Sequence, residues 1–122
     1  MYSGQLLDHF QNPRNAGDLM DPDAVVEVEN PVCGDVLRLS LKMEDGRIAR
    51  VGFKAKGCVP SIACGSALTE LMVGKTTEQA RAISREEITV AVGGLPQAST
   101  HAAQLALDAV SELLRQASPT KR

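Results

Sequence analysis

Four side chains of metal-binding types occur far apart in the sequence, each close to a glycine or a proline. Cys33 and Asp35 are two residues apart, Cys58 is near the middle of the chain, and His101 is in the last quarter. Because glycine and proline interrupt regular elements, these residues are predicted to lie at the ends of elements. Thiolates and imidazole suit zinc, copper or an iron-sulfur centre, whereas calcium and magnesium prefer oxygen ligands. The four residues therefore predict a soft-metal site assembled by the fold.

The carboxylate and the third thiol need separate interpretation. A hard carboxylate is a comparatively poor ligand for iron in a sulfide cluster, so we hypothesise that Asp35 keeps bound metal exchangeable. Cys58 is expected at a helix N-terminus, where free backbone N–H groups and the helix dipole favour a thiolate. Cys64 shares an apolar helical stripe with leucines and is expected to be buried, yet it is close enough to Cys58 to act as an additional ligand.

Hydrophobic periodicity predicts the elements that position these residues. Alternating apolar and charged residues are typical of half-buried strands, and apolar residues at helical spacing indicate helices. The predicted elements are a helix at 3–11, strands at 26–29, 37–43 and 50–56, a helix at 60–74, short helices opened by capping boxes at Thr76 and Ser84, and a helix from 102 ending at Ser118-Pro119. Asp45-Gly46 predicts a tight hairpin. His9 is expected to be exposed. The fold class is α+β, with a three-stranded antiparallel sheet, an N-terminal helix and several C-terminal helices packed on it.

Composition limits the classes of protein. The 122 residues suit one domain, 1–122, with 43% hydrophobic and 23% charged residues. We find no apolar run of the roughly 18 to 20 residues that a membrane span needs, and no signal peptide, so a cytoplasmic protein is expected. A net charge of −2 with two Phe, one Tyr and no Trp argues against nucleic acid. Three cysteines without a secretory signal indicate reduced thiols.

Motifs in order along nearly the whole chain resemble the IscU/NifU-type iron-sulfur cluster assembly scaffold family. The segments are 8–17 (Asp-His-Phe-Gln-Asn-Pro-Arg-Asn-Ala-Gly), 30–35 (Asn-Pro-Val-Cys-Gly-Asp), 53–58 (Phe-Lys-Ala-Lys-Gly-Cys) and 93–96 (Gly-Gly-Leu-Pro), followed by His101. The resemblance implies an IscU/SufE-like fold and a scaffold that holds a transient [2Fe-2S] cluster. It also implies two kinds of partner, a cysteine desulfurase that supplies sulfur and apo iron-sulfur proteins that receive the cluster. Cys33, Asp35, Cys58 and His101 match the ligand positions of the family.

The chain departs from the family pattern at three places. Ala102 stands where the family has its third cysteine, and Cys64 stands where serine is expected. Residues 97–99, Gln-Ala-Ser, lack the Val and Lys that a dedicated Hsp70-type chaperone grips in some members, which puts that contact in doubt. One thiol is therefore lost and another is present nearby.

Three functions stay open at this point. The leading one is a cluster scaffold, a carrier rather than an enzyme. The second is a sulfur acceptor of the SufE type, in which Cys58 alone takes a persulfide. The third is a zinc-binding adaptor, although closed structural zinc sites prefer four Cys or His ligands and Asp35 favours an open site. Zn²⁺ is also expected to be able to replace the cluster in the scaffold.

Overall fold

A three-stranded sheet and a layer of helices form the fold, and the computed structural model describes residues 2–31 and 34–117. The elements, in chain order, are α1 (Gly4–Gln11), β1 (Ala24–Glu29), β2 (Val36–Glu44), β3 (Arg47–Lys56), α2 (Val59–Met72), α3 (Thr77–Arg81), α4 (Arg85–Ala91), the short 3-10 helix η1 (Gln97–Ser99) and α5 (Thr100–Ala117). The predicted order of helices and strands is confirmed, and η1 is the element that periodicity did not predict. Among the described residues no helix is both long and apolar enough to cross a membrane.

The sheet is antiparallel throughout, in the order β1-β2-β3. The predicted hairpin joins β2 to β3, and Asp45 and Gly46 both adopt positive φ angles, as a tight turn of this kind requires. Glu27 of β1 lies opposite Arg38 of β2, and their side-chain charges are 3.9 Å apart. An acidic and a basic side chain on the outward faces therefore pair between these strands.

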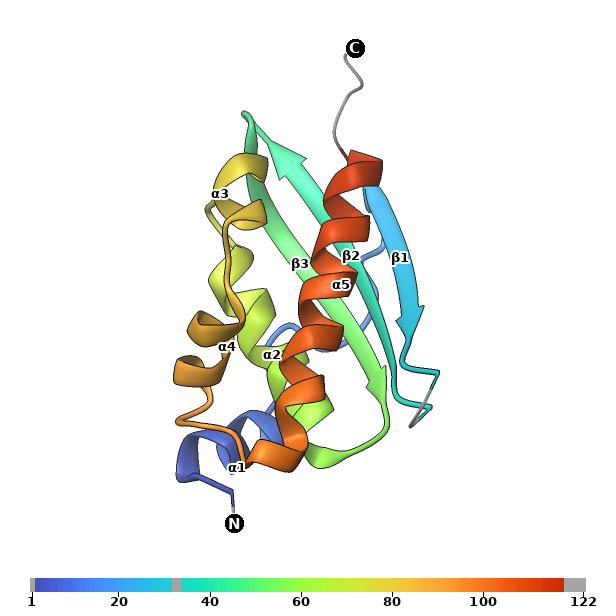
Figure 1. Cartoon of the computed structure of the whole chain (residues 1–122). Coiled ribbons are helices and arrows are strands. Elements are labelled where there is room, and N and C mark those ends of the chain that lie inside the picture. Colours follow the sequence, from blue (N-terminus) through green and yellow to red (C-terminus); the bar gives the residue numbers. More distant parts are fainter. Residues whose placement is uncertain (1, 32–33, 118–122) are drawn as a thin grey trace.

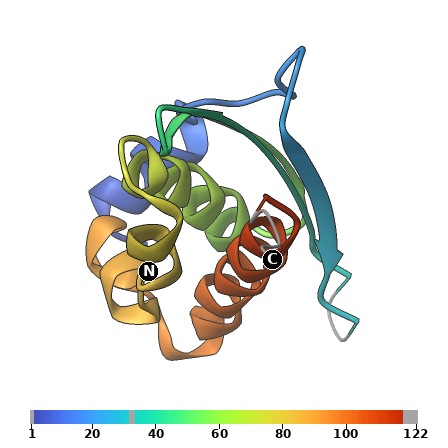
Figure 2. The ribbon, with the colours of Figure 1, turned by 90° about the horizontal axis from the view of Figure 1, so that it is seen from above.

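Two long helices cover one face of the sheet, α5 over β1 and β2 and α2 over β3. Figure 2 shows the sheet curving over this helical layer. Inward side chains of the strands and apolar faces of the helices form the main core, whose largest fully buried members include Leu37, Leu39, Leu41, Ile48, Leu68, Met72, Ile88, Leu113 and Leu114. The two short helices begin with complete capping boxes at Thr76 and Ser84, as predicted.

The segment after α1 covers the free edge of β3. The backbone N–H of Gly17 donates to the carbonyl of Phe53, and the N–H of Phe53 donates to the carbonyl of Asn15. Because an edge strand exposes unpaired backbone groups, this segment protects β3 from pairing with another chain.

His9 is buried, so the expectation that it is exposed was wrong. Only 7% of this residue is exposed, because α1 packs on α2 and turns this side of the helix inward. Its Nδ1 lies 2.7 Å from the Ser66 hydroxyl, and its Nε2 lies 3.7 Å from Glu70. The backbone N–H of Arg14 donates to the same hydroxyl. His9 therefore belongs to a polar contact that joins α1 and the following segment to α2.

Candidate metal centre

The sheet register brings the predicted site residues to one end of the molecule. Val36 at the start of β2 pairs with Lys56 at the end of β3, so Asp35 before β2 lies beside Cys58 after β3. His101 is in the first turn of α5, which begins at the same end (Figure 1). The ligand atoms of Asp35, Cys58 and His101 lie within 4.8 Å of one another. Cys33, the fourth predicted ligand, lies outside the described residues.

One carboxylate oxygen is the centre of this cluster. The Asp35 Oδ2 atom lies 3.1 Å from Cys58 Sγ and 3.6 Å from His101 Nε2, while Sγ and Nε2 are 3.9 Å apart. The other oxygen, Oδ1, accepts a hydrogen bond of 3.2 Å from the backbone N–H of Cys58. One sulfur, one nitrogen and one oxygen donor therefore face a common point. This mixed donor set fits zinc or iron better than calcium or magnesium.

The three donors differ in exposure. The Asp35 side chain is 6% exposed and forms the inner wall, whereas the His101 side chain is 36% exposed. Cys58, like His101, is partly buried. A bound metal or cluster would therefore contact the buried carboxylate on its inner side and would remain accessible to solvent on the side of His101.

Gly57 makes room for the buried carboxylate. Its φ angle is +141°, in the region that favours glycine, and a Cβ atom at this position would lie 2.1 Å from Asp35 Oδ1. That separation is far below a van der Waals contact. A side chain at residue 57 would therefore force Asp35 out of its place beside Cys58.

Cys58 is not a ready thiolate, which corrects the expectation drawn from its position at a helix start. It is the N-cap residue of α2, as expected, but burial raises the pKa of its thiol. The Ser61 hydroxyl lowers this pKa, and the nearby Asp35 raises it by hydrogen bonding and by its charge, so the net shift is upward. The thiol donates to Asp35 Oδ2. A metal that binds Cys58 must therefore displace a proton.

Ser61 is a member of the cluster that sequence reasoning missed. Its hydroxyl donates to Asp35 Oδ2 over 2.6 Å and lies 3.2 Å from Cys58 Sγ, and the residue is 3% exposed. The signal in the sequence is its spacing, because a residue three positions after an N-cap faces the cap across the first helical turn.

The remaining cysteine lies in the core. Cys64 is fully buried, as expected, and burial raises the pKa of its thiol to about 12. Among the described residues, the group of potential metal ligands comprises Asp35, Cys58 and His101 without Cys64. Ala102, next to His101, is 1% exposed. Whether Cys64 binds metal stays a prediction, and its burial argues against it.

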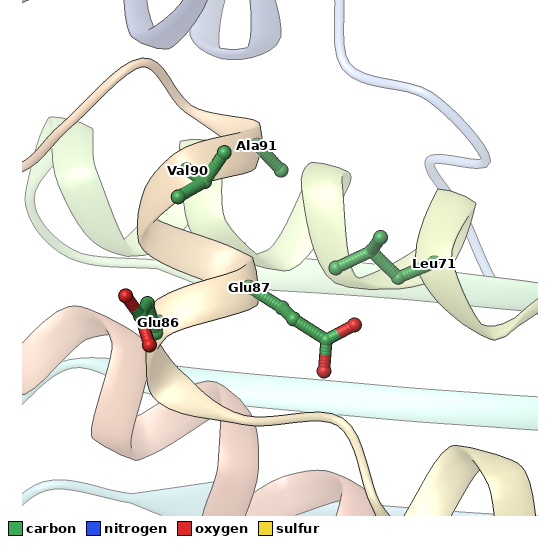
Figure 3. A pocket seen from close by; sticks show the side chains of 5 residues that line it. All are labelled: Leu71, Glu86, Glu87, Val90 and Ala91. Carbon is green, nitrogen blue, oxygen red and sulfur yellow. The ribbon is translucent and has the colours of Figure 1, made fainter.

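A groove between α2 and α4 lies apart from these ligands. It has a volume of about 460 Å³ and is lined by Leu71, Glu86, Glu87, Val90 and Ala91. In Figure 3, Val90 and Ala91 project from α4 and Leu71 from α2. Asp35, Cys58 and His101 do not line it. These potential metal ligands lie at the N-terminal end of α2, whereas the groove lies near its C-terminal end.

The family model described as the NifU-like N terminal domain matches residues 1–117. The iron-sulfur cluster assembly scaffold protein IscU 1 of Archaeoglobus fulgidus is 46% identical over 110 residues, which are 90% of this chain and 72% of that protein. IscU of Azotobacter vinelandii is 42% identical over 118 residues, which are 93% of this chain and 91% of that protein.

Solved structures share the fold of this chain. The NifU-like N-terminal protein of Brucella abortus is 25% identical, with a TM-score of 0.75 over 94% of this chain and 92% of that one. A SufU protein of Fervidobacterium islandicum shares the fold, with a TM-score of 0.75 at 20% identity over 93% of this chain and 96% of that one. The family model covers residues 1–117, and relatives more than 40% identical cover most of the chain. The chain therefore belongs to the NifU-like N-terminal domain family.

Proposed function

We propose that this chain is a scaffold on which an iron-sulfur cluster is assembled and from which the cluster is passed on. The observation that supports this function is the convergence of Asp35, Cys58 and His101 from three separate parts of the chain to within 4.8 Å. The similarity to proteins named as scaffolds for cluster assembly agrees with it. The protein is a carrier, because the cluster is its cargo and not a resident cofactor.

The ligand set suits a cluster that the protein must release to a recipient. Thiolate and imidazole bind iron well, while the hard carboxylate of Asp35 contributes less to the stability of a sulfide cluster. We propose a [2Fe-2S] cluster held by Cys33, Asp35, Cys58 and His101. The partly exposed His101 side chain would leave one side of the cluster accessible to solvent. Weak retention at Asp35 and access past His101 would let a recipient take the cluster.

The same donor set also suits Zn²⁺. Zinc takes sulfur, nitrogen and oxygen ligands in a four-coordinate arrangement, and an open or exchangeable site is typical of zinc that is not structural. We therefore propose that Zn²⁺ occupies the ligands in the absence of iron and sulfide.

The partners follow from the scaffold role. A cysteine desulfurase would deliver sulfur at the ligand end of the molecule, and apo iron-sulfur proteins would receive the cluster there. We place this exchange in the cytoplasm, where thiols stay reduced. We further propose that residues 1–122 act as a single domain, supported by the one sheet and its one helical layer.

The SufE-type alternative is less well supported. A persulfide acceptor needs a reactive thiolate, but burial and Asp35 raise the pKa of Cys58. An acceptor with one thiol would also not need Asp35 and His101 within 4 Å of that sulfur, as they are here.

Anaerobic reconstitution tests the proposed function. The protein is supplied with Fe²⁺, L-cysteine, a cysteine desulfurase and a thiol reductant that converts persulfide sulfur to sulfide, and iron, sulfide and visible absorption are measured before and after adding an apo-ferredoxin. We expect a coloured protein with equal iron and sulfide that transfers its cluster, and a Cys58→Ala variant that retains neither. A colourless protein with tightly held zinc would support the adaptor function, and a metal-free persulfide on Cys58 would support the acceptor.

A further inference from the structure

Ser61 lies inside the ligand cluster although it is not one of the proposed ligands. Its hydroxyl is 2.6 Å from Asp35 Oδ2 and 3.2 Å from Cys58 Sγ, so it touches two of the three donors. It is 3% exposed, so water has almost no access to replace either contact. A serine in the first turn of a helix often caps backbone N–H groups, but this hydroxyl is directed to a carboxylate instead.

We propose that Ser61 is a positioning residue for the metal cargo, whose hydroxyl orients the Asp35 carboxylate toward the bound metal. This inference rests on the proposed function, because it assumes that Asp35, Cys58 and His101 bind the cargo. It adds a residue that acts through Asp35 and does not itself bind metal.

The geometry of the carboxylate supports this role. The two oxygens of Asp35 have different partners: Oδ1 accepts from the backbone N–H of Cys58, and Oδ2 accepts from the Ser61 hydroxyl and from the Cys58 thiol. Oδ2 is also the oxygen nearest the Cys58 sulfur and the His101 ring. With both oxygens held, the plane of the carboxylate is fixed. A metal that binds Cys58 displaces the thiol proton and with it the hydrogen bond from Cys58 Sγ to Oδ2, so the orientation of this oxygen then depends more strongly on the Ser61 hydroxyl.

Hydrogen bonds of this kind tune metal affinity. Partners that orient a ligating carboxylate typically change affinity by about 10- to 100-fold when they are removed. Asp35 is almost fully buried, so water cannot readily replace the Ser61 hydroxyl. We expect Ser61→Ala to weaken Zn²⁺ binding by ~10- to 100-fold and to shift the d–d absorption of bound Co²⁺.

A double-mutant cycle separates positioning from packing. Zn²⁺ affinity is measured by competition with a chromophoric chelator for the wild type, Ser61→Ala, Asp35→Ala and the double variant. If Ser61 acts through Asp35, its substitution weakens binding in the wild type and has little further effect in the Asp35→Ala background. An equal loss in both backgrounds would show that the residue acts independently of Asp35, through packing or through Cys58, and would overturn the inference.

Ser66→Ala is the matched control, because Ser66 is a fully buried serine on the same helix that bonds to His9 and not to the ligands. This variant should lose stability but keep the wild-type Zn²⁺ affinity and Co²⁺ spectrum. If Ser61→Ala binds as the wild type does, while Cys58→Ala does not bind, the inference about Ser61 is wrong and the proposed function stands. If Cys58→Ala binds Zn²⁺ as tightly as the wild type, the ligand set itself is wrong and the inference fails with it.

Discussion

At the residue scale, the site depends on one position without a side chain. Asp35 is able to stand beside Cys58 because Gly57 leaves its side of the backbone open. Gly57 also adopts a φ of +141°, a backbone conformation that residues with a Cβ atom rarely adopt. The glycine before Cys58 thus serves both the turn after β3 and the placement of a ligand.

Gly57→Ala is expected to lower both stability and metal affinity. The strained backbone should cost on the order of 1 to 3 kcal/mol of unfolding free energy, and the clash at 2.1 Å should displace Asp35 and weaken Zn²⁺ binding. Gly74→Ala is the control, because Gly74 also has a positive φ, +89°, but a Cβ there would meet nothing within 4 Å. It should lose stability in urea denaturation and keep its Zn²⁺ affinity. Equal affinities for the two variants would contradict this account of Gly57.

Cys64→Ser tests whether the buried thiol of Cys64 is a metal ligand. The side chain is fully buried in the apolar core, so a hydroxyl there should destabilise the fold by about 1 to 3 kcal/mol. The metal content after anaerobic reconstitution should match that of the wild type. Loss of metal as complete as in Cys58→Ala would identify Cys64 as a further ligand.

At the element scale, the N-terminal helix is fixed to α2 by polar as well as apolar contacts. Leu6 of α1 packs with Ala63 and Ala67 of α2, and His9 bonds to Ser66 on the same helix. Burial, the largest cause, and the charge of Arg14 lower the pKa of His9, while Glu70 and Asp8 raise it by less. The contact between the two helices therefore favours the neutral imidazole.

This burial predicts a pH dependence of stability. In the unfolded chain His9 takes up a proton near pH 6.5, but in the folded protein it does so only at lower pH. The unfolded state binds more protons in that interval, so the unfolding free energy should fall as the pH decreases below about 6.5. The loss should end below the folded-state pKa.

His9→Gln tests this contribution, because the amide is polar like the imidazole but does not titrate. Urea denaturation at about pH 7.5 and about pH 5.5 should give a smaller difference in unfolding free energy for the variant than for the wild type. An unchanged difference would assign the pH dependence to other groups.

At the scale of the whole molecule, the ligands connect parts that are distant in the sequence. Asp35 precedes β2, Cys58 joins β3 to α2, and His101 begins α5, so a bound metal would tie the sheet to both long helices. A ligand that binds only the folded state stabilises it by mass action. Cargo binding should therefore be visible as a change in the stability of the whole fold.

Zn²⁺ is expected to stabilise the protein against unfolding. At a free concentration about 100 times the dissociation constant, the gain should be about 2.7 kcal/mol, provided that the unfolded chain does not bind the metal. Thermal or urea denaturation with and without Zn²⁺ measures it. The gain should vanish in Cys58→Ala, whereas Cys64→Ser should keep it despite its lower starting stability.

Local sequence signals predicted most elements because each depends on neighbours along the chain. Alternation of apolar and charged residues marked the strands, and Asp45-Gly46 marked the hairpin through its backbone preference. Thr76 and Ser84 marked two helix starts, since a capping box closes within one turn. The 3-10 helix at 97–99 has no comparable local pattern and was missed.

The sequence by itself determined the family pattern, the α+β class and the residue types available for metal binding. Tertiary structure decided which side chains meet and how they titrate, because burial and contact between distant segments are not encoded in local spacing. It buried His9 under α2, raised the pKa of Cys58 against the effect of its helix start, and brought Ser61 and Gly57 to Asp35. The donors come from the sequence, and their distances come from the antiparallel register that sets the start of β2 beside the end of β3.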